Sequence, residues 1–160
     1  MFIFQDWPAN AGNSKGRIFA FFFRLAALSC RGKLLSVLCI PFRIFYKVFF
    51  EWIVGAEIPF NARIGKGLKV YHLQAIVINK DVVIGENCIL RQSTTIGNRR
   101  DNGGCPVIGN NVNIGAHVCI LGEITIGDNV QIGAGSMVLS NIPPNSVVVG
   151  NPARILKQTV

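Results

Sequence analysis

Apolar residues in the C-terminal two thirds of the chain recur every six positions. A first run contains Ile58, Ile64, Val70 and Ile76. After a two-residue slip, a second run continues from Ile78 to Val138 with one interruption, at Asn102. An α-helix repeats every 3.6 residues and a half-buried strand every two, so neither explains a period of six. Three six-residue sides per turn do explain it, and the pattern predicts a triangular parallel β-helix with the aliphatic side chains stacked inside.

Glycine, proline and polar residues indicate where this β-helix turns and where it ends. The residue after the inward aliphatic is often glycine, which is expected near the corners. The polar, glycine-rich stretch 98–106 breaks the rhythm and is expected to be a loop extruded from the prism. Residues 143–160 begin with two prolines and are expected to cap the last coil, because open β edges need cover. The β-helix domain is thus predicted to span residues 56–157, with about five coils of roughly 18 residues each.

The N-terminal region, residues 1–55, has a different composition. All 11 Phe, both Trp and both Tyr residues of the chain lie within residues 1–71. Gly32 is expected to separate two helices, and Pro41 to kink or delay the second. Charged residues recur at helical spacings and indicate a polar stripe on each helix: Arg17, Arg24 and Arg31 on the first, and Arg43, Lys47 and Glu51 on the second.

The sequence leaves two roles open for these helices. They either pack on each other, on the β-helix or on sister subunits, or residues 15–55 lie in a membrane interface with their Phe side chains inward. Residues 1–55 contain seven basic and two acidic residues, a balance that suits anionic headgroups. No uninterrupted apolar run reaches the roughly 18 to 20 residues that a membrane span needs.

Length, charge and cysteine content narrow the class of protein. A chain of 160 residues holds one domain with at most a small appendage. Its net charge of +8 suits an anionic cofactor or lipid phosphates, and the predicted fold offers no element for reading nucleic acid. The five cysteines are odd in number and form no CxxC pair, which favours a reducing compartment. We therefore expect a cytoplasmic protein, with peripheral contact at the inner face of the cytoplasmic membrane as a further possibility.

Motifs in the repeat region resemble a known family. The segment from Ile108 to Ile155, IGNNVNIGAHVCILGEITIGDNVQIGAGSMVLSNIPPNSVVVGNPARI, is similar to the C-terminal half of the hexapeptide-repeat acyltransferases. The segment from Gly55 to His72, GAEIPFNARIGKGLKVYH, is most similar to serine acetyltransferases, and especially to the short acetyltransferases of exopolysaccharide and colanic-acid gene clusters. The resemblance implies a left-handed parallel β-helix, a homotrimer or multiple of three, and acetyl-coenzyme A as co-substrate.

The same resemblance points to catalytic residues. His72 falls where serine acetyltransferases have their catalytic base, and Glu57 where they have the acidic residue that orients it. An imidazole with a pKa near 6.5 can take the proton of an attacking hydroxyl, and a carboxylate can fix its tautomer. His117 is the alternative base, because IGAHV reproduces the setting of the catalytic histidine in galactoside and maltose acetyltransferases. No metal is expected, since γ-carbonic anhydrases share this fold but need three histidine ligands and this chain has two.

Cofactor residues follow from the resemblance as well. It implies that coenzyme A lies in a groove between two prisms, against the backbone of Gly115, Ala116, Gly133 and Ala134. Arg154 or Lys157 is expected near the nucleotide phosphates. For each glycine a purely steric role is an equal alternative.

Departures from the serine acetyltransferase pattern bear on the acceptor. Those enzymes have Asp immediately before the catalytic histidine and an Arg-His pair in the extruded loop, whereas this chain has Tyr71, and Gly104 followed by Cys105. A zwitterionic substrate would lose its charged contacts, so serine is not the expected acceptor. Tyr71 offers an aromatic face and a hydroxyl that suit a pyranose ring. Tyr71 and Cys105 are the predicted substrate-binding residues, and a covalent role for Cys105 is disfavoured.

The sequence therefore predicts a trimeric O-acetyltransferase. It is expected to move acetyl from acetyl-coenzyme A to a sugar hydroxyl in capsule, exopolysaccharide or O-antigen synthesis, with the acceptor either lipid-linked or nucleotide-linked. Serine O-acetyltransferase is the alternative enzyme. A non-catalytic β-helix scaffold is the alternative of another class.

Overall fold

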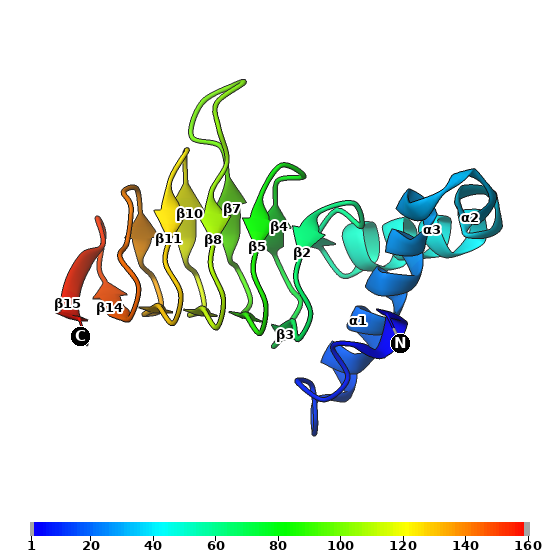
Figure 1. Ribbon diagram of the computed structural model, residues 1–160, viewed down its shortest axis with the longest axis horizontal. Coiled ribbons are helices and arrows are strands. Elements are labelled where there is room, and N and C mark those ends of the chain that lie inside the picture. Colours follow the sequence, from blue (N-terminus) through cyan, green and yellow to red (C-terminus); the bar gives the residue numbers. More distant parts are fainter. Residues whose placement is uncertain (1, 159–160) are drawn as a thin grey trace.

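The computed structural model describes residues 2–158. Helical elements precede the strands and lie at one end of an elongated molecule, while the strands stack towards the C-terminus at the other (Figure 1). No helix in this described range is long and apolar enough to cross a membrane. The helical elements are η1 (Phe2–Phe4), α1 (Ser14–Ala27), η2 (Leu28–Arg31), α2 (Lys33–Leu38), α3 (Ile40–Tyr46) and η3 (Lys47–Ile53).

The strands form three sheets, here termed sheets A, B and C, one for each side of a prism. Sheet A contains β1 (Ala56–Glu57), β4 (Ile76–Ile78), β7 (Thr95–Gly97), β10 (Cys119–Leu121) and β13 (Met137–Val138). Sheet B contains β2 (Arg63–Ile64), β5 (Val83–Ile84), β8 (Val107–Ile108) and β11 (Thr125–Ile126). Sheet C contains β3 (Lys69–Val70), β6 (Ile89–Leu90), β9 (Asn113–Ile114), β12 (Gln131–Ile132), β14 (Ser146–Val149) and β15 (Arg154–Gln158).

This architecture is the left-handed parallel β-helix predicted from the sequence, with about five coils. The six-residue period places one aliphatic side chain of each side in an internal column, and neighbours in a column are in register. All of these side chains are buried, and the narrow interior selects Ile, Val and Leu because they fill it without a ring. The columns are Ile58, Ile78, Ile96, Ile120 and Val138 for sheet A, Ile64, Ile84, Ile108, Ile126 and Ile142 for sheet B, and Val70, Leu90, Ile114, Ile132 and Val148 for sheet C.

The two-residue slip in the hexad pattern is a longer corner in the first coil. Val77 pairs with Thr95, and Ile78 pairs with Ile96. Six residues separate Leu90 from Ile96, so the equivalent corner between Val70 and Ile78 is two residues longer. This corner, which leads from sheet C to sheet A, carries His72.

Glycines sit where successive coils approach most closely. A Cβ built on Gly65 would lie 2.7 Å from the backbone of Gly85, and one on Gly115 would lie 2.6 Å from the nitrogen of Ala134. Contacts below about 3 Å are not tolerated, so these positions exclude any side chain. Close packing between coils is therefore sufficient to explain why residue 115 is glycine.

Aromatic side chains join the helices to the first coil. Phe19 and Phe50 are buried, with ring centroids 5.5 Å apart in an edge-to-face arrangement, and Tyr46 lies 5.4 Å from Phe50. Burial raises the pKa of Tyr46 well above its usual value, so its hydroxyl keeps a proton. That hydroxyl donates to the carbonyl of Ile58 at 2.6 Å. As expected, the helical chain breaks at Gly32, which is extended, and Pro41 lies in the first turn of a new helix, α3, which begins at Ile40.

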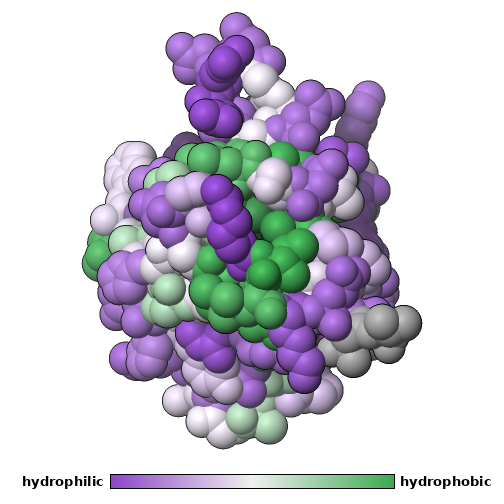
Figure 2. Space-filling model, turned by 90° about the vertical axis from the view of Figure 1, so that its left-hand side faces the viewer, coloured by the Kyte–Doolittle hydropathy of each residue, from purple (hydrophilic) through white to green (hydrophobic). Residues whose placement is uncertain are grey.

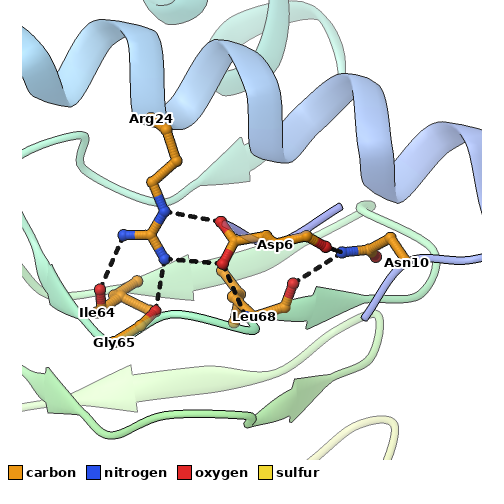
Figure 3. A network of polar contacts seen from close by, with 6 residues as sticks. All are labelled: Asp6, Asn10, Arg24, Ile64, Gly65 and Leu68. Atoms are coloured by element: carbon orange, nitrogen blue, oxygen red, sulfur yellow. Dashed lines mark hydrogen bonds and ion pairs between the residues drawn. The ribbon is translucent and has the colours of Figure 1, made fainter. Parts of the chain in front are cut away.

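A buried ion pair seals the first coil, and it corrects the predicted polar stripe on the first helix. Arg24 is 3% exposed and its Nε lies 2.7 Å from Asp6. Arg24 also donates to the carbonyls of Ile64 and Gly65, while Asp6 accepts from the backbone N–H of Leu68 (Figure 3). The helical spacing of Arg24 thus reflects a buried structural cation, whereas a solvent-facing stripe was expected.

The C-terminal end of the prism is closed by one antiparallel strand. β15 pairs with β14 with a register shift, and its residues are all exposed, including Leu156 at 67%. Figure 2 faces this end and shows an apolar area near its centre, with a polar projection above it. The projection is the chain between β7 and β8, which leaves the prism (Figure 1). Residues 159–160 of the predicted cap lie outside the described residues.

Removing one partner of the buried ion pair is expected to be strongly destabilising. Asp6→Ala leaves the guanidinium of Arg24 buried without its counter-charge, and the free energy of unfolding should fall by about 3–5 kcal/mol. Urea unfolding followed by circular dichroism measures this. Asp81→Ala removes the partner of the exposed cation Lys80 and should cost below about 1 kcal/mol. Equal losses in the two variants would contradict the sealing role.

Two glycine-to-alanine substitutions distinguish a steric clash between coils from the loss of backbone freedom in the unfolded chain. Gly115→Ala forces a methyl group against the next coil and should lower the free energy of unfolding by about 1–3 kcal/mol. Gly32→Ala is the matched control, because its backbone is extended and no atom lies within 4 Å of an added Cβ. It should leave stability unchanged or raise it slightly by restricting the unfolded chain. Thermal unfolding at fixed protein concentration tests both, and an unaffected Gly115→Ala protein would refute the close coil contact.

Candidate active site

The corner between sheets C and A gathers most of the predicted site residues into one strip. Register places equivalent residues of successive coils side by side along the prism. One row consists of Tyr71, Arg91, Gly115 and Gly133, and the next row of Gln92, Ala116 and Ala134, while His72 lies in the longer first corner between Tyr71 and Gln74, the equivalent of Gln92. The sequence predicted His72 and five of these seven row residues as site residues, and only the coil-to-coil register shows that they are neighbours.

His72 lies on the exposed surface of the longer first corner. Its backbone adopts a left-handed conformation, with φ of 54°. The residues on both sides fix this position: the Tyr71 N–H donates to the carbonyl of Leu90 at 2.9 Å, and the Leu73 side chain is buried. The imidazole is therefore accessible while its backbone is held, which suits a general base acting on a bound hydroxyl.

Glu57 lies on the same first coil but on the face of sheet A. It pairs with Val77 in the ladder and is exposed. With Glu51, Trp52 and other residues it lines a pocket of about 290 Å³. Burial raises the pKa of Glu51; Lys47 opposes this shift, and Glu57 adds to it. No hydrogen bond or ion pair within residues 2–158 joins Glu57 to His72, so the orienting role of Glu57 stays a prediction.

His117 lies on the same corner, further along the prism. Its N–H donates to the carbonyl of Gln92 at 3.0 Å, and its φ is 57°. Ala75 and Ser93 occupy the equivalent positions of the two preceding coils with nearly the same φ. Since coils repeat at about 4.8 Å, His117 is about 10 Å along the axis from the first corner. His72 and His117 thus lie on the same corner of the prism, so both are placed to act as the base.

The sequence did not indicate Arg91 and Gln92 of the strip, or Lys69 on the adjacent strand. The Lys69 ammonium and the Arg91 guanidinium lie over the Tyr71 ring, 4.8 and 5.5 Å from its centroid. Arg91 is held there by bonds to the Asn113 side chain and the Ile114 carbonyl. The side-chain oxygen of Gln92 is buried without a donor within residues 2–158. These residues follow no motif, because they converge from strands about 20 positions apart, and they make the corner beside His72 positive.

The predicted cofactor residues continue the strip towards the C-terminus. Gly115 and Gly133 carry no side chain, and the N–H groups of Ala116 and Ala134 donate no hydrogen bond within residues 2–158. Val149 pairs with Gly133 in the coil stack and with Arg154 of β15. Arg154 and Lys157 are exposed. Free N–H groups of two alanines, each beside a glycine and followed along the prism by two cations, fit an extended ligand with amide carbonyls and terminal phosphates.

Cys105 lies away from this strip. It ends the loop that leaves the prism between sheets A and B, whereas Tyr71 lies at the corner between sheets C and A. Burial raises the pKa of the Cys105 thiol, and Asp81 adds to this, so the reactive thiolate is disfavoured at neutral pH. Within one chain the structure thus separates the two predicted substrate-binding residues.

Known proteins are similar to this chain in sequence and in fold. Residues 105–140 match the family described as bacterial transferase hexapeptide (six repeats). WcaB of Escherichia coli strain K12, named for acetyl transfer in colanic acid biosynthesis, is 49% identical over 116 residues, 72% of this chain and of that protein. The mitochondrial serine acetyltransferase 3 of Arabidopsis thaliana is 48% identical over 98 residues, 60% of this chain and 25% of that protein.

A solved structure extends the similarity to nearly the whole chain. Serine acetyltransferase of Brucella abortus strain S19, in complex with coenzyme A, superposes with a TM-score of 0.81 and 27% identity. The match covers 99% of this chain and 68% of that one. The named relatives are enzymes of acetyl transfer, which favours an enzyme over the scaffold alternative. The chain belongs to the hexapeptide-repeat acyltransferase family and is an acetyltransferase.

Proposed function

We propose that this acetyltransferase moves the acetyl group of acetyl-coenzyme A to a hydroxyl of a sugar acceptor in exopolysaccharide, capsule or O-antigen synthesis. The similarity to WcaB over 72% of both chains supports this class of pathway. The observation that carries the choice of a sugar is the corner beside His72, where Lys69 and Arg91 lie over the ring of Tyr71.

The charge of this corner opposes the serine alternative. The amino group of serine would approach Lys69 and Arg91, and like charges at close range are unfavourable. A sugar hydroxyl carries no such penalty, and Tyr71 offers a pyranose its hydroxyl and the part of its ring that Lys69 and Arg91 leave uncovered. The two cations favour any acceptor that bears a carboxylate or phosphate, serine's own carboxylate included, so the argument against serine rests on its ammonium group.

His72 is proposed as the general base. Acetyl-coenzyme A supplies the thioester whose acyl group is transferred. The imidazole of His72 accepts the proton of the acceptor hydroxyl as its oxygen bonds to the acyl carbon, and returns this proton to the sulfur as the carbon–sulfur bond breaks. Such assistance is worth about 10²- to 10⁴-fold. Glu57 is proposed to orient the imidazole, His117 remains the alternative base, and no metal is assigned.

The strip along the C–A corner is proposed to bind the co-substrate. The N–H groups of Ala116 and Ala134 are available to amide carbonyls, and Gly115 and Gly133 leave the approach open. Arg154 and Lys157, at the end of the same strip, are proposed to hold the nucleotide phosphates.

Three copies of the chain are proposed to complete the site. Cys105 and the loop that it ends leave one edge of the prism, while Tyr71 and His72 lie on another. A neighbouring copy packed against this three-sided prism brings its loop to the His72 corner, which joins the two predicted substrate-binding residues across the interface. This trimer is proposed to be cytoplasmic, with peripheral contact at the inner face of the cytoplasmic membrane where the acceptor is lipid-linked.

A panel of acceptors tests the proposed function. Release of free thiol from acetyl-coenzyme A should rise with one or more neutral or acidic sugars and stay at background with L-serine, because a cationic corner excludes the ammonium group. Thiol release is followed with a chromogenic disulfide. Turnover with L-serine and with none of the sugars would replace the proposal with serine O-acetyltransferase.

Substitution of the two histidines identifies the base. His72→Ala should lower kcat by about 10²- to 10⁴-fold because proton abstraction is lost, while the Kd for acetyl-coenzyme A stays nearly constant. His117→Ala should be milder. Steady-state kinetics and calorimetric titration measure both quantities, and an inactive His117 variant beside an active His72 variant would reverse the assignment.

A further inference from the structure

The helices present a large apolar surface that nothing in residues 2–158 covers. We term it the helical apolar face. Five of its residues and Pro41 surround a single hollow of about 540 Å³, so the surface is continuous over α3 and η3. Exposed apolar patches of this extent indicate an interaction surface. The face comprises Leu34, Val37, Leu38, Ile40, Phe42, Ile44, Phe45, Val48, Phe49, Trp52 and Ile53, all at least 39% exposed.

The charges around this face are mostly basic, with Glu51 and Glu57 beside Trp52 at one edge. Residues 14–53 contain seven basic residues and one acid, Glu51. Of the seven, only Arg24 forms an ion pair within residues 2–158. Arg43 and Lys47 line a second hollow together with Ile40 and Ile44 of the face, so cations stand directly at its border.

The apolar side chains and the bordering cations together indicate what binds to the helical apolar face. A second copy of the chain packed on this face would bring its own Arg43 and Lys47 against the same two cations, which is unfavourable. An anionic bilayer offers both an apolar interior for the aliphatic and aromatic side chains and phosphates for the bordering cations. We infer that the helical apolar face docks on the surface of an anionic lipid bilayer.

Docking in this way places the candidate catalytic corner beside the lipid. Phe49 of the face also lines an apolar pocket of about 290 Å³ whose other residues include Lys15, Leu73 and Gln74. Leu73 directly follows His72, so the apolar surface continues to the corner of the proposed base. On the basis of the proposed function, the acceptor sugar is then one carried by a membrane lipid.

Vesicle sedimentation tests the docking itself, without reference to acetyl transfer. The protein should sediment with phosphatidylcholine vesicles that contain phosphatidylglycerol, should not sediment with pure phosphatidylcholine, and should be released by high salt. Two variants probe the face. Arg31→Gln/Lys33→Gln/Lys47→Gln removes three exposed cations, and Leu34→Gln/Val37→Gln removes two of the most exposed apolar side chains. Each should lower the vesicle partition coefficient at least about tenfold.

Matched controls lie on the prism. Arg63→Gln/Lys66→Gln/Lys80→Gln removes three exposed cations outside the face, and Leu156→Gln removes an exposed apolar side chain there. Both should keep binding within about twofold, because neither borders the bilayer in the inferred orientation. The substituted residues of the face are exposed, so circular dichroism should show folded protein throughout.

Light scattering separates the inference from self-association. The mass should be three chains for the unmodified protein and for the Leu34/Val37 variant alike. Failure to bind anionic vesicles at low salt, equal loss in the prism controls, or a lower mass for the Leu34/Val37 variant would each overturn the inference. Thiol release with soluble sugars would be unaffected by these outcomes, so a failed docking is distinguishable from a failed function.

Discussion

Coil-to-coil backbone hydrogen bonding is the constraint on which this molecule depends. Each coil of a parallel β-helix satisfies its N–H and C=O groups through the coils above and below, so the first coil has no partner on its outer side. Asp6 and Arg24 supply one: the aspartate accepts from Leu68, and the guanidinium donates to the carbonyls of Ile64 and Gly65. Asn10 and Asn13 extend the seal to the carbonyls of Leu68 and Val70.

The same register that stacks the coils builds the candidate site. Residues roughly 20 positions apart meet along one corner because each coil returns the chain to the same edge. An insertion in one coil then changes the site locally and leaves the columns intact. The two extra residues that carry His72 are such an insertion, and the loop that ends at Cys105 is another.

The N-terminal region combines two tasks on opposite faces. One face packs Phe19, Tyr46 and Phe50 into the end of the prism and positions the sealing arginine. The other face is apolar, bordered by cations and exposed. Because η3 leads directly into β1, whatever binds the outer face is held close to Glu57 and the His72 corner. Fold closure and location of the enzyme are thus coupled through one short segment.

The sequence by itself determined the β-helix and the position of the two-residue slip, because a period of six is satisfied by no other regular structure. It also identified His72, Glu57 and the glycines as candidates through their resemblance to known motifs. The tertiary structure decided which residues are neighbours: Lys69 and Arg91 converge on Tyr71, while Cys105 is moved to another edge. It also decided the role of Arg24, since helical spacing cannot distinguish an arginine that faces water from one that faces unpaired carbonyls. Local periodicity determines the direction in which a side chain points. The partner of that side chain depends on which distant coil the fold places beside it.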